Sequence, residues 1–522
     1  MALDLLLIHP NSRAVYQGLA DEFTALETPV WAGMLATYCR LKGHSVAILD
    51  AEAENLDPAA VAARVATAAP TLACIVCYGH QPSASTQVMP AAGATLRAIH
   101  KQSRGQLTML LGGHVAALPD RTMAEERPYF LCTGEGPVTL HETLQAIKET
   151  EAGFIVGVKT RARGLIYRVG EETFRTQDAP LVEDLDREMP CPAYDLMPMH
   201  LYRAHNWHAF GSQSRSGGLD RQPYASLYTT LGCPYSCSFC CIQAPFLSSA
   251  PGSDDMSPGS RGDVSVAAAT GRQVNSYRRW SPAQVARNLK LLRETYGVRN
   301  IKIADEMFVL NQRHVNGVCA EIFKAGLSDL NLWAYARVDT VRDDAQVEVL
   351  RAAGFRWLAL GIESADAHVR DGSLKTFGQE KIHTTLARLK RAGIHTIANY
   401  IFGLPGETAQ TMQATLDLAC ELNTEFANLY SAMAYPGSAL YAAAVRDGSP
   451  LPSSWAGYSQ HGPDCLPLGT ASLTGAEIRA FRDLAFRTYF DRQAYRDMLE
   501  RVFGKATEKH VRRMLDAKLE RA

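Results

Sequence analysis

Three cysteines lie close together in the stretch LGCPYSCSFCC at residues 231–241, and their spacing is the first sign of chemistry in this sequence. Cys233, Cys237 and Cys240 follow a Cys-x3-Cys-x2-Cys pattern. A [4Fe-4S] cluster usually takes four thiolates, so three closely spaced ones would leave one iron open to a further ligand. The spacing therefore predicts an iron–sulfur cluster that takes part in a reaction, rather than one that only stores electrons.

The position of this loop supports the same interpretation. The apolar residues 225–227 and the following Tyr228 to Thr230 are typical of the end of a strand, and Gly232 with Pro234 would then break it into a loop. Loops at the carboxyl ends of strands hold the sites of α/β enzymes. Two alternatives stay open from the residues alone, a zinc site without its fourth ligand and a group of buried small hydrophobic side chains. Cys241 falls outside the spacing and is predicted to pack.

The loop resembles that of the radical S-adenosylmethionine (SAM) enzymes. The resemblance implies that the open iron chelates SAM, and that an electron from the cluster cleaves it to a 5′-deoxyadenosyl radical. Several later strand ends match family contacts to SAM, although Glu363 could also be a helix N-terminal acid stabilised by the helix dipole. The implied SAM-binding residues are Phe239, Asp305, Glu306, Arg337, Glu363, Ser364 and Gly403.

Composition indicates an ordinary globular protein of about three domains in its 522 residues. The 53 basic and 54 acidic residues nearly cancel, and no basic run stands out, so we expect no nucleic-acid partner. The amino terminus lacks the pattern of a secretory signal, and no stretch is apolar over a membrane-spanning length. We therefore expect a cytoplasmic protein without a membrane association, whose other cysteines are reduced and buried.

Residues 1–150 alternate between apolar strand patterns and helical patterns, which predicts a doubly wound α/β domain with five parallel strands. The candidate strands are 3–8, 46–49, 72–77, 107–111 and 129–132, and the candidate helices are 29–42, 58–68, 83–101 and 137–149. Polar and glycine-rich turns follow four of the strands, and they would meet at the carboxyl edge of the sheet, where ligands of such sheets bind. No Gly-x-Gly-x-x-Gly follows the first strand, which argues against a dinucleotide site.

Placed ahead of the cysteine loop, this domain resembles the cobalamin-binding domain of cobalamin-dependent radical SAM enzymes. An Asp-x-His-x-x-Gly motif, which would supply the lower ligand of cobalt, is absent from the sequence. Any single histidine on these turns is also consistent with an ordinary hydrogen-bonded loop residue. The implied cobalamin-binding residues are Asn11, His80, Ser83, Ser85, Gly112, Gly113, His114, Gly134, Glu135 and Gly136.

Three further segments complete the predicted organisation. Residues 151–215 are predicted to form a linker, and 216–445 an open (β/α)6 barrel, the partial TIM barrel expected of a radical SAM core. The stretch 248–276 is rich in Ser, Gly and Asp and is predicted to be an inserted loop. Residues 446–522 are predicted to be mainly helical, and the aromatic and polar stretch 455–470 could cover the barrel mouth or simply pack.

The resemblance implies an enzyme that methylates an unreactive carbon, or less often phosphorus, of a small molecule. One SAM would methylate cobalamin and a second would generate the radical that activates the substrate, with electrons from a low-potential donor such as ferredoxin or flavodoxin. Two alternatives remain open: a cobalamin-dependent radical SAM cyclase or rearrangement enzyme, and a non-catalytic corrinoid or iron–sulfur carrier. The substrate and the oligomeric state do not follow from the sequence.

Overall fold

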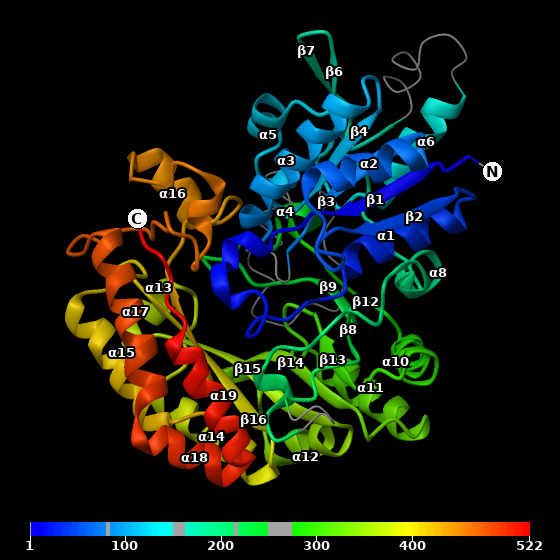
Figure 1. The fold of residues 1–522 in the computed structure, drawn as a ribbon. Coiled ribbons are helices and arrows are strands. Elements are labelled where there is room, and N and C mark those ends of the chain that lie inside the picture. Colours follow the sequence, from blue (N-terminus) through cyan, green and yellow to red (C-terminus); the bar gives the residue numbers. More distant parts are fainter. Residues whose placement is uncertain (1, 80–83, 150–161, 213–217, 249–273) are drawn as a thin grey trace.

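The computed structural model describes residues 2–79, 84–149, 162–212, 218–248 and 274–522. Two α/β units are stacked on each other, with a helical C-terminal segment against the second (Figure 1). The predicted insertion at 248–276 lies almost wholly outside the described residues, as do His80 and Ser83. The order of the units agrees with the predicted fold class.

The amino-terminal unit is built on one sheet with the strand order β2-β1-β3-β4-β5-β6-β7. The first five strands are parallel, as predicted, and every residue of β1 and β3 is buried. Their bounds are β1 Leu5–His9, β2 Val46–Asp50, β3 Leu72–Cys77, β4 Thr108–Gly112 and β5 Phe130–Cys132.

Helices cover both faces of this sheet, which explains why its strands are apolar runs rather than alternating patterns. Leu5 and Leu7 join the core on the side of α1, whereas Leu6 and Ile8 join the core on the side of α2 and α3. The helices are α1 Val30–Leu41, α2 Pro58–Ala68, α3 Ser85–Gln102, α4 Gly113–Ala117, α5 Pro119–Glu126 and α6 Pro137–Lys148.

The predicted five-stranded sheet is too small, because two more strands come from the segment predicted as a linker. β6 (Leu165–Val169) pairs antiparallel with β5, and β7 (Glu172–Arg175) pairs antiparallel with β6. The side chains of β7 are mostly exposed, so this strand has no apolar pattern that sequence could show. The hairpin extends the sheet beyond the five parallel strands (Figure 1).

The second unit is an open sheet of six parallel strands, ordered β17-β16-β15-β14-β13-β8. This is the predicted open barrel. The strands are β8 Tyr224–Leu227, β13 Asn300–Ile303, β14 Asn331–Arg337, β15 Phe355–Glu363, β16 His395–Phe402 and β17 Phe426–Ser431. The helices are α10 Pro282–Tyr296, α11 Gln312–Lys324, α12 Asp344–Ala352, α13 Ala367–Gly372, α14 Gln379–Ala392, α15 Ala409–Leu422 and α16 Ala439–Asp447. Ser281 caps α10 by accepting a hydrogen bond from the Gln284 amide (3.2 Å).

The connector between the units packs against the amino-terminal end of the barrel strands. The Trp207 ring lies 5.0 Å from the Trp333 ring and 5.4 Å from the Trp357 ring, measured between centroids. These large buried aromatic side chains close the barrel floor. Short elements of the connector and nearby loops are α8 Leu185–Glu188, η1 Arg13–Leu19, η3 Tyr194–Leu196, η4 Trp207–Ala209, η5 Ala244–Phe246 and η6 Val338–Thr340.

The C-terminal segment packs helices against the edge of the barrel next to β17. They are α17 Gly475–Asp491, α18 Gln493–Phe503 and α19 Lys505–Asp516, preceded by η7 Trp455–Tyr458. Gln460 exchanges two hydrogen bonds of 2.9 Å with the backbone of Ser431 at the end of β17. The stretch 455–470 is thereby fixed over the barrel mouth. Within the described part of the chain, no helix has both the length and the apolar character to cross a bilayer.

Candidate active site between the two sheets

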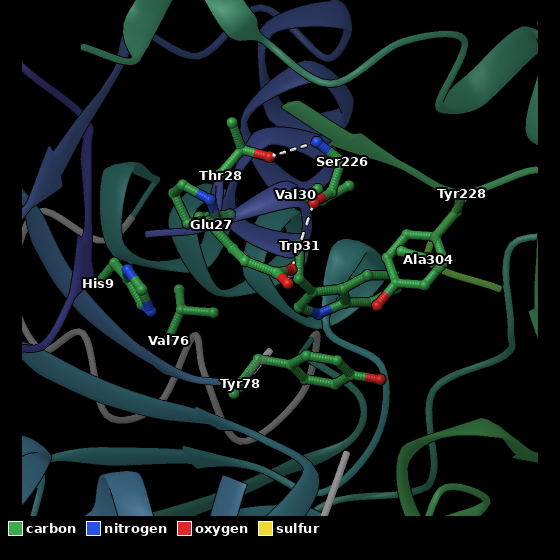
Figure 2. Close-up of a pocket in the computed structure, with 13 residues that line it drawn as sticks. His9, Glu27, Thr28, Val30, Trp31, Val76, Tyr78, Ser226, Tyr228 and Ala304 are labelled. Atoms are coloured by element: carbon green, nitrogen blue, oxygen red, sulfur yellow. Dashed lines mark hydrogen bonds between the residues drawn. The ribbon is translucent and has the colours of Figure 1, made fainter. Parts of the chain in front are cut away.

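The two units meet through a buried junction, which Figure 2 shows around a small cavity of about 30 Å³. Trp31 and Tyr78 of the first unit and Tyr228 of the second line this cavity. Ser226 in β8 donates its amide to the Thr28 hydroxyl (2.9 Å) and its hydroxyl to Glu27 (3.2 Å). The first barrel strand is therefore held directly by the loop that begins α1.

Glu27 also anchors a buried charge of the barrel. The Lys302 ammonium in β13 lies 3.0 and 3.1 Å from the two carboxylate oxygens of Glu27, and both side chains are at most 5% exposed. The same ammonium lies 5.2 Å from the centre of the Trp333 ring. A buried charge needs such partners, so this pair fixes the relative position of the two units.

The cysteine loop follows β9 (Thr230–Gly232) and lies within a hairpin, because β9 pairs antiparallel with the later strand β12 (Tyr277–Arg279). Gly232 has a φ of 81°, and a Cβ there would lie 2.2 Å from the Ser276 carbonyl oxygen, so only glycine fits. The hairpin also pairs β10 (Leu247–Ser248) with β11 (Val274–Asn275) further out. The loop therefore leaves the sheet at a position fixed by backbone contacts.

The three predicted cluster ligands lie on this one loop. The Cys240 amide donates to the Cys237 carbonyl (3.0 Å), and burial raises the pKa of the Cys233 thiol to about 12. Within the described ranges, no group of three or more His, Cys, Asp or Glu side chains is arranged to hold a metal ion. Three thiols in this spacing match the donor set of an open-iron cluster.

The predicted acidic pair Asp305 and Glu306 divides into two different roles. Asp305 is fully buried, and its carboxylate accepts hydrogen bonds from the amides of Thr229 (2.6 Å) and Thr230 (3.1 Å) and from the Thr229 hydroxyl. Asp305 thus holds the turn that leads into the cysteine loop. Glu306 instead lines the large cavity described below. Burial raises the pKa of the Glu306 carboxyl to about 8, against the opposing attraction of Lys302.

Glu363 also reaches the cavity, from the end of β15, and it has a left-handed backbone conformation with a φ of 67°. Such a conformation is uncommon outside glycine and is often found at functional positions. Its carboxylate forms a buried ion pair with Lys375. The same lysine ammonium lies 5.9 Å from the centre of the Phe239 ring, which is in the cysteine loop.

Three other predicted SAM residues support the site from behind its surface. The Arg337 guanidinium is clamped by Asp339 (2.9 and 3.1 Å) and lies 3.9 Å from the Cys237 sulfur. The Glu407 carboxylate accepts hydrogen bonds from the Ser364 hydroxyl (3.1 Å) and the Gly403 amide. Ser364 is completely buried and Gly403 does not line the cavity, so both shape the strand ends through Glu407.

A cavity of about 350 Å³ unites these elements between the barrel, the amino-terminal unit and the C-terminal segment. Phe239, Cys240, Glu306 and Glu363 line it together, so residues predicted from three separate motifs meet in one place. A size of this order is ordinary for a ligand site. Its other lining residues include Tyr16, Gln87, Lys302, Trp333, Tyr335, Asn399, Asn428, Tyr430, Gln460 and His461.

Several of these lining residues were not predicted. Tyr16 and Gln87 come from the amino-terminal unit, and the Gln87 amide donates to the Tyr16 hydroxyl (2.8 Å). Nothing in a sequence shows that such distant segments meet. Lys302 did leave a signal, because a lysine between two isoleucines in a buried strand requires a special partner.

Among the predicted cobalamin residues, those after β4 are deeply buried. Gly112 has a φ of 147°, and a Cβ there would lie 2.0 Å from the Cys77 carbonyl oxygen. Gly113 begins α4. His114 donates or accepts a hydrogen bond with Thr86 (3.2 Å), its ring packs 4.4 Å from Trp455, and burial lowers its pKa to about 3. His114 is therefore a neutral imidazole inside the domain.

The remaining cobalamin candidates lie at the sheet edge. Ser85 accepts the Gly79 amide (3.3 Å) at the start of α3, and Asn11 donates to the Leu56 carbonyl (3.2 Å). Gly136 has a φ of 107° and is packed against Leu111. Gly134 faces a separate cavity, of about 510 Å³, which Cys237 and Cys240 also line. The edge of the first sheet and the cysteine loop thus border the same space.

Glu135 takes part in a buried ion pair that links the two units. It forms an ion pair with Arg278 in β12 (2.6 Å) and accepts the Val182 amide (2.6 Å), and both charged side chains are at most 8% exposed. We expect Glu135→Leu to lower the free energy of unfolding by about 3–5 kcal/mol, because it leaves a buried guanidinium unpaired. The double variant Glu135→Leu/Arg278→Met should recover most of this loss in urea denaturation. Equal stability of Glu135→Leu and the unaltered protein would contradict the prediction.

Comparisons with known proteins agree with this architecture. Residues 16–144 match the B12 binding domain, and residues 227–419 match the Radical SAM superfamily. The chain is 27% identical to an uncharacterized methyltransferase of Pyrococcus horikoshii, over 83% of this chain and 82% of the relative. It is 25% identical to the anaerobic magnesium-protoporphyrin IX monomethyl ester cyclase of Rubrivivax gelatinosus, over 84% and 69%.

Solved structures share the complete fold. The radical SAM methyltransferase TsrM of Kitasatospora setae, with cobalamin and a [4Fe-4S] cluster bound, superposes with a TM-score of 0.64 at 18% identity, over 95% of this chain and 90% of that one. The cobalamin-dependent enzyme OxsB, with aqua-cobalamin and SAM bound, gives 0.65 at 14% identity, over 98% and 71%.

A radical SAM half-barrel with a three-cysteine loop at its mouth defines the class of enzyme. With the B12 binding domain facing that loop, the chain belongs to the cobalamin-dependent radical SAM enzymes. This confirms the predicted family and shows that the protein is an enzyme, so the interpretation as a carrier is set aside.

Proposed function

We propose that this enzyme transfers a methyl group from SAM, by way of cobalamin, to an unactivated carbon, or less often phosphorus, of a small molecule. One observation carries the proposal: the cysteine loop, the acids Glu306 and Glu363, and segments of the B12 binding domain all face one cavity. Separate sites would suffice for two independent reactions. The cysteine loop also lines the cavity that Gly134 faces, so a radical formed at the cluster and a methyl group from cobalamin would both be able to reach one substrate.

The chain's residues can be assigned to three cofactors. Cys233, Cys237 and Cys240 would hold the cluster, Phe239, Glu306 and Glu363 would contact SAM, and Gly134 would border cobalamin. When bound, these groups supply a 5′-deoxyadenosyl radical and a transferable methyl group.

The protein's own contribution is positioning and exclusion of water. The ionised Glu306 carboxylate would accept a hydrogen bond from the ammonium of SAM, and the Glu363–Lys375 pair holds the strand end at which SAM lies. Arg337 places positive charge beside the Cys237 sulfur and would stabilise a thiolate there. The floor around Trp207 and the cover at Gln460 enclose the cavity, which would keep other hydrogen donors away from a radical.

The named relatives support methyl transfer but also favour a second candidate. One relative that matches more than four fifths of this chain is named a methyltransferase, and another that matches as much is named a cyclase. Oxidative cyclisation would use the same radical and cluster without delivering a methyl group. Both candidates need a low-potential one-electron donor such as ferredoxin or flavodoxin, and the twelve free cysteines favour a cytoplasmic setting.

Incubation with a cell extract of small molecules separates these two candidates. The reconstituted enzyme would receive SAM with a deuterated methyl group, a reductant and the extract under anaerobic conditions. Methyl transfer predicts a product that carries one trideuteromethyl group, with S-adenosylhomocysteine and 5′-deoxyadenosine formed in equal amounts. An unlabelled product that forms with deoxyadenosine alone would establish cyclisation or rearrangement instead.

Two glycines test the assignment of the cobalamin edge. A Cβ at Gly134 meets nothing within 4 Å, whereas one at Gly112 collides with the Cys77 backbone. We expect Gly134→Val to fold normally but to bind hydroxocobalamin about tenfold more weakly, because the side chain enters the cavity that cobalamin would occupy. Gly112→Val should instead fail to fold stably. Unchanged cobalamin affinity in Gly134→Val, measured by absorbance titration, would remove Gly134 from the site.

The pKa of Glu306 predicts a pH dependence of SAM binding. Burial raises this pKa to about 8, and the ionised carboxylate accepts a stronger, charge-assisted hydrogen bond from the SAM ammonium than the neutral acid does. Below pH 8 the affinity for SAM should therefore rise with pH, by up to about tenfold per unit. Calorimetry between pH 6 and 7.5 would measure the slope on the cluster-loaded enzyme. Glu306→Gln should give a flat profile, and an equally steep slope in this variant would assign the titration to another group.

A further inference from the structure

A second cavity, of about 250 Å³, lies beside the catalytic cavity on the open side of the half-barrel. Its lining comes from the segment 16–25, residues 205–207, Phe426, His461, helix α17 and the C-terminal stretch 514–519. Its lining is mainly apolar, and the apolar members are Leu19, Phe23, Ala25, Trp207, Phe426, Phe486, Met514, Ala517 and Leu519.

The charged groups at this cavity are largely neutralised by one another. Arg482 pairs with Asp483 (2.9 Å) and donates to the Leu429 carbonyl (2.7 Å), and Asp483 also pairs with Arg521 (2.8 Å). These contacts direct the charges toward protein partners. Arg487, which is exposed, also lines the cavity, so one further positive charge lies beside an otherwise mainly apolar surface.

An apolar cavity of this size is suited to bind a ligand. Protein interiors are close-packed and leave few spaces larger than a water molecule. An apolar cavity of roughly 150 Å³ is already large enough to take up an apolar ligand rather than water. The lining here offers such a ligand aromatic and aliphatic contacts on several sides.

The cavity lies next to the catalytic one, and four residues line both: Tyr16, His205, Trp207 and His461. Tyr16 and His461 form a ring pair with centroids 5.5 Å apart. Next to them, the Gln17 side chain donates to the carbonyls of His461 and Glu520 and accepts the Glu520 amide (2.8 Å). One layer of side chains, fixed by Gln17, thus separates the two cavities.

We infer that the second cavity is a subsite for the substrate, and that the substrate is an amphipathic molecule with an apolar tail. This inference rests on the proposed function. The polar part would lie in the catalytic cavity beside Asn399 and Asn428, whose side chains are hydrogen-bonded to each other (2.8 Å). The tail would pass the Tyr16–His461 layer and pack against Phe486 and Met514.

A fluorescent apolar probe tests the subsite without knowledge of the substrate. The enzyme loaded with cluster, cobalamin and SAM would be titrated with N-phenyl-1-naphthylamine, a neutral molecule whose emission increases in apolar surroundings. We expect one saturable site. Ala517→Phe should weaken it by about tenfold or more, because the added ring occupies the cavity. The matched control Ala506→Phe lies on the exposed face of α19 and should bind as the unaltered enzyme does.

A second variant protects the test against a folding defect. Phe486→Ala enlarges the cavity, so it should bind a bulkier probe, N-phenyl-1-naphthylamine with an added butyl chain, more tightly than the unaltered enzyme does. Equal affinities for the probe in Ala517→Phe and Ala506→Phe, or no saturable binding to the unaltered enzyme, would overturn the subsite.

The class of substrate is tested with labelled extract. Cell extract would be divided into butanol-soluble and water-soluble fractions and each supplied to the enzyme with deuterated SAM. We expect the label in products from the butanol fraction. Products labelled only from the water-soluble fraction would overturn the inference while the proposed function stands. Failure of the deuterated methyl group to reach cobalamin in the same samples would instead count against the proposed function.

Discussion

We expect Cys237→Ala to lower 5′-deoxyadenosine formation by on the order of 1,000-fold or more, because the cluster would lose one of three thiolate ligands and SAM cleavage depends on it. Cobalamin binding should change little, since Cys237 only borders the cavity that Gly134 faces and the B12 binding domain at 16–144 lies in the other unit. The measurements are iron and sulfide content, the cluster absorbance and product formation by chromatography.

Cys241→Ala is the matched control for this prediction. Cys241 is adjacent to Cys240, is buried and lines the same catalytic cavity, but it lies outside the three-cysteine spacing. It should keep a full cluster and most of the SAM cleavage. If Cys241→Ala lost the cluster and Cys237→Ala kept it, the assignment of ligands would be wrong.

The second large effect separates the neighbours Asp305 and Glu306. Above pH 8, where Glu306 is ionised, Glu306→Gln should weaken SAM binding by about 10- to 100-fold, because a charge-assisted hydrogen bond contributes about 1.5–3 kcal/mol. Its thermal stability should change little. Asp305→Asn should do the opposite: the amide presents a donor to the amides of Thr229 and Thr230, so stability should fall by about 1–3 kcal/mol.

Calorimetric titration with SAM and urea denaturation together distinguish the two roles. Similar losses of SAM affinity in both variants, without a loss of stability in Asp305→Asn, would show that the two acids form one SAM-binding motif. The structure favours a division, because Asp305 is fully buried among its three donors whereas Glu306 faces the cavity.

The sequence predicted the parts of the fold that depend on local pattern. Fully apolar strands such as 72–77 and capped helices such as the one at Ser281 are set by neighbouring residues, and they were found where expected. The hairpin at 165–175 was missed because β7 is exposed and has no apolar side to show. A strand that is buried on both faces gives an apolar run in the sequence, whereas an exposed strand gives no such pattern.

The candidate site was predicted in part for a similar reason. Strand-end motifs identify Glu306 and Glu363, which the structure brings into one cavity with the cysteine loop. Whether an acid faces the cavity or a backbone turn, as Glu306 and Asp305 do, depends on packing between units. The contributions of Tyr16 and His461 depend on contacts between residues more than 400 positions apart, which no local pattern records.

Transfer of a methyl group from SAM to cobalamin within this chain is tested most directly by one anaerobic measurement. The enzyme would be reconstituted with iron, sulfide and hydroxocobalamin, reduced, given SAM with a deuterated methyl group and analysed by mass spectrometry without substrate. We expect the enzyme to form cobalamin that carries the deuterated methyl group, together with S-adenosylhomocysteine. Deoxyadenosine alone, with cobalamin bound but never labelled, would contradict the methyltransferase assignment.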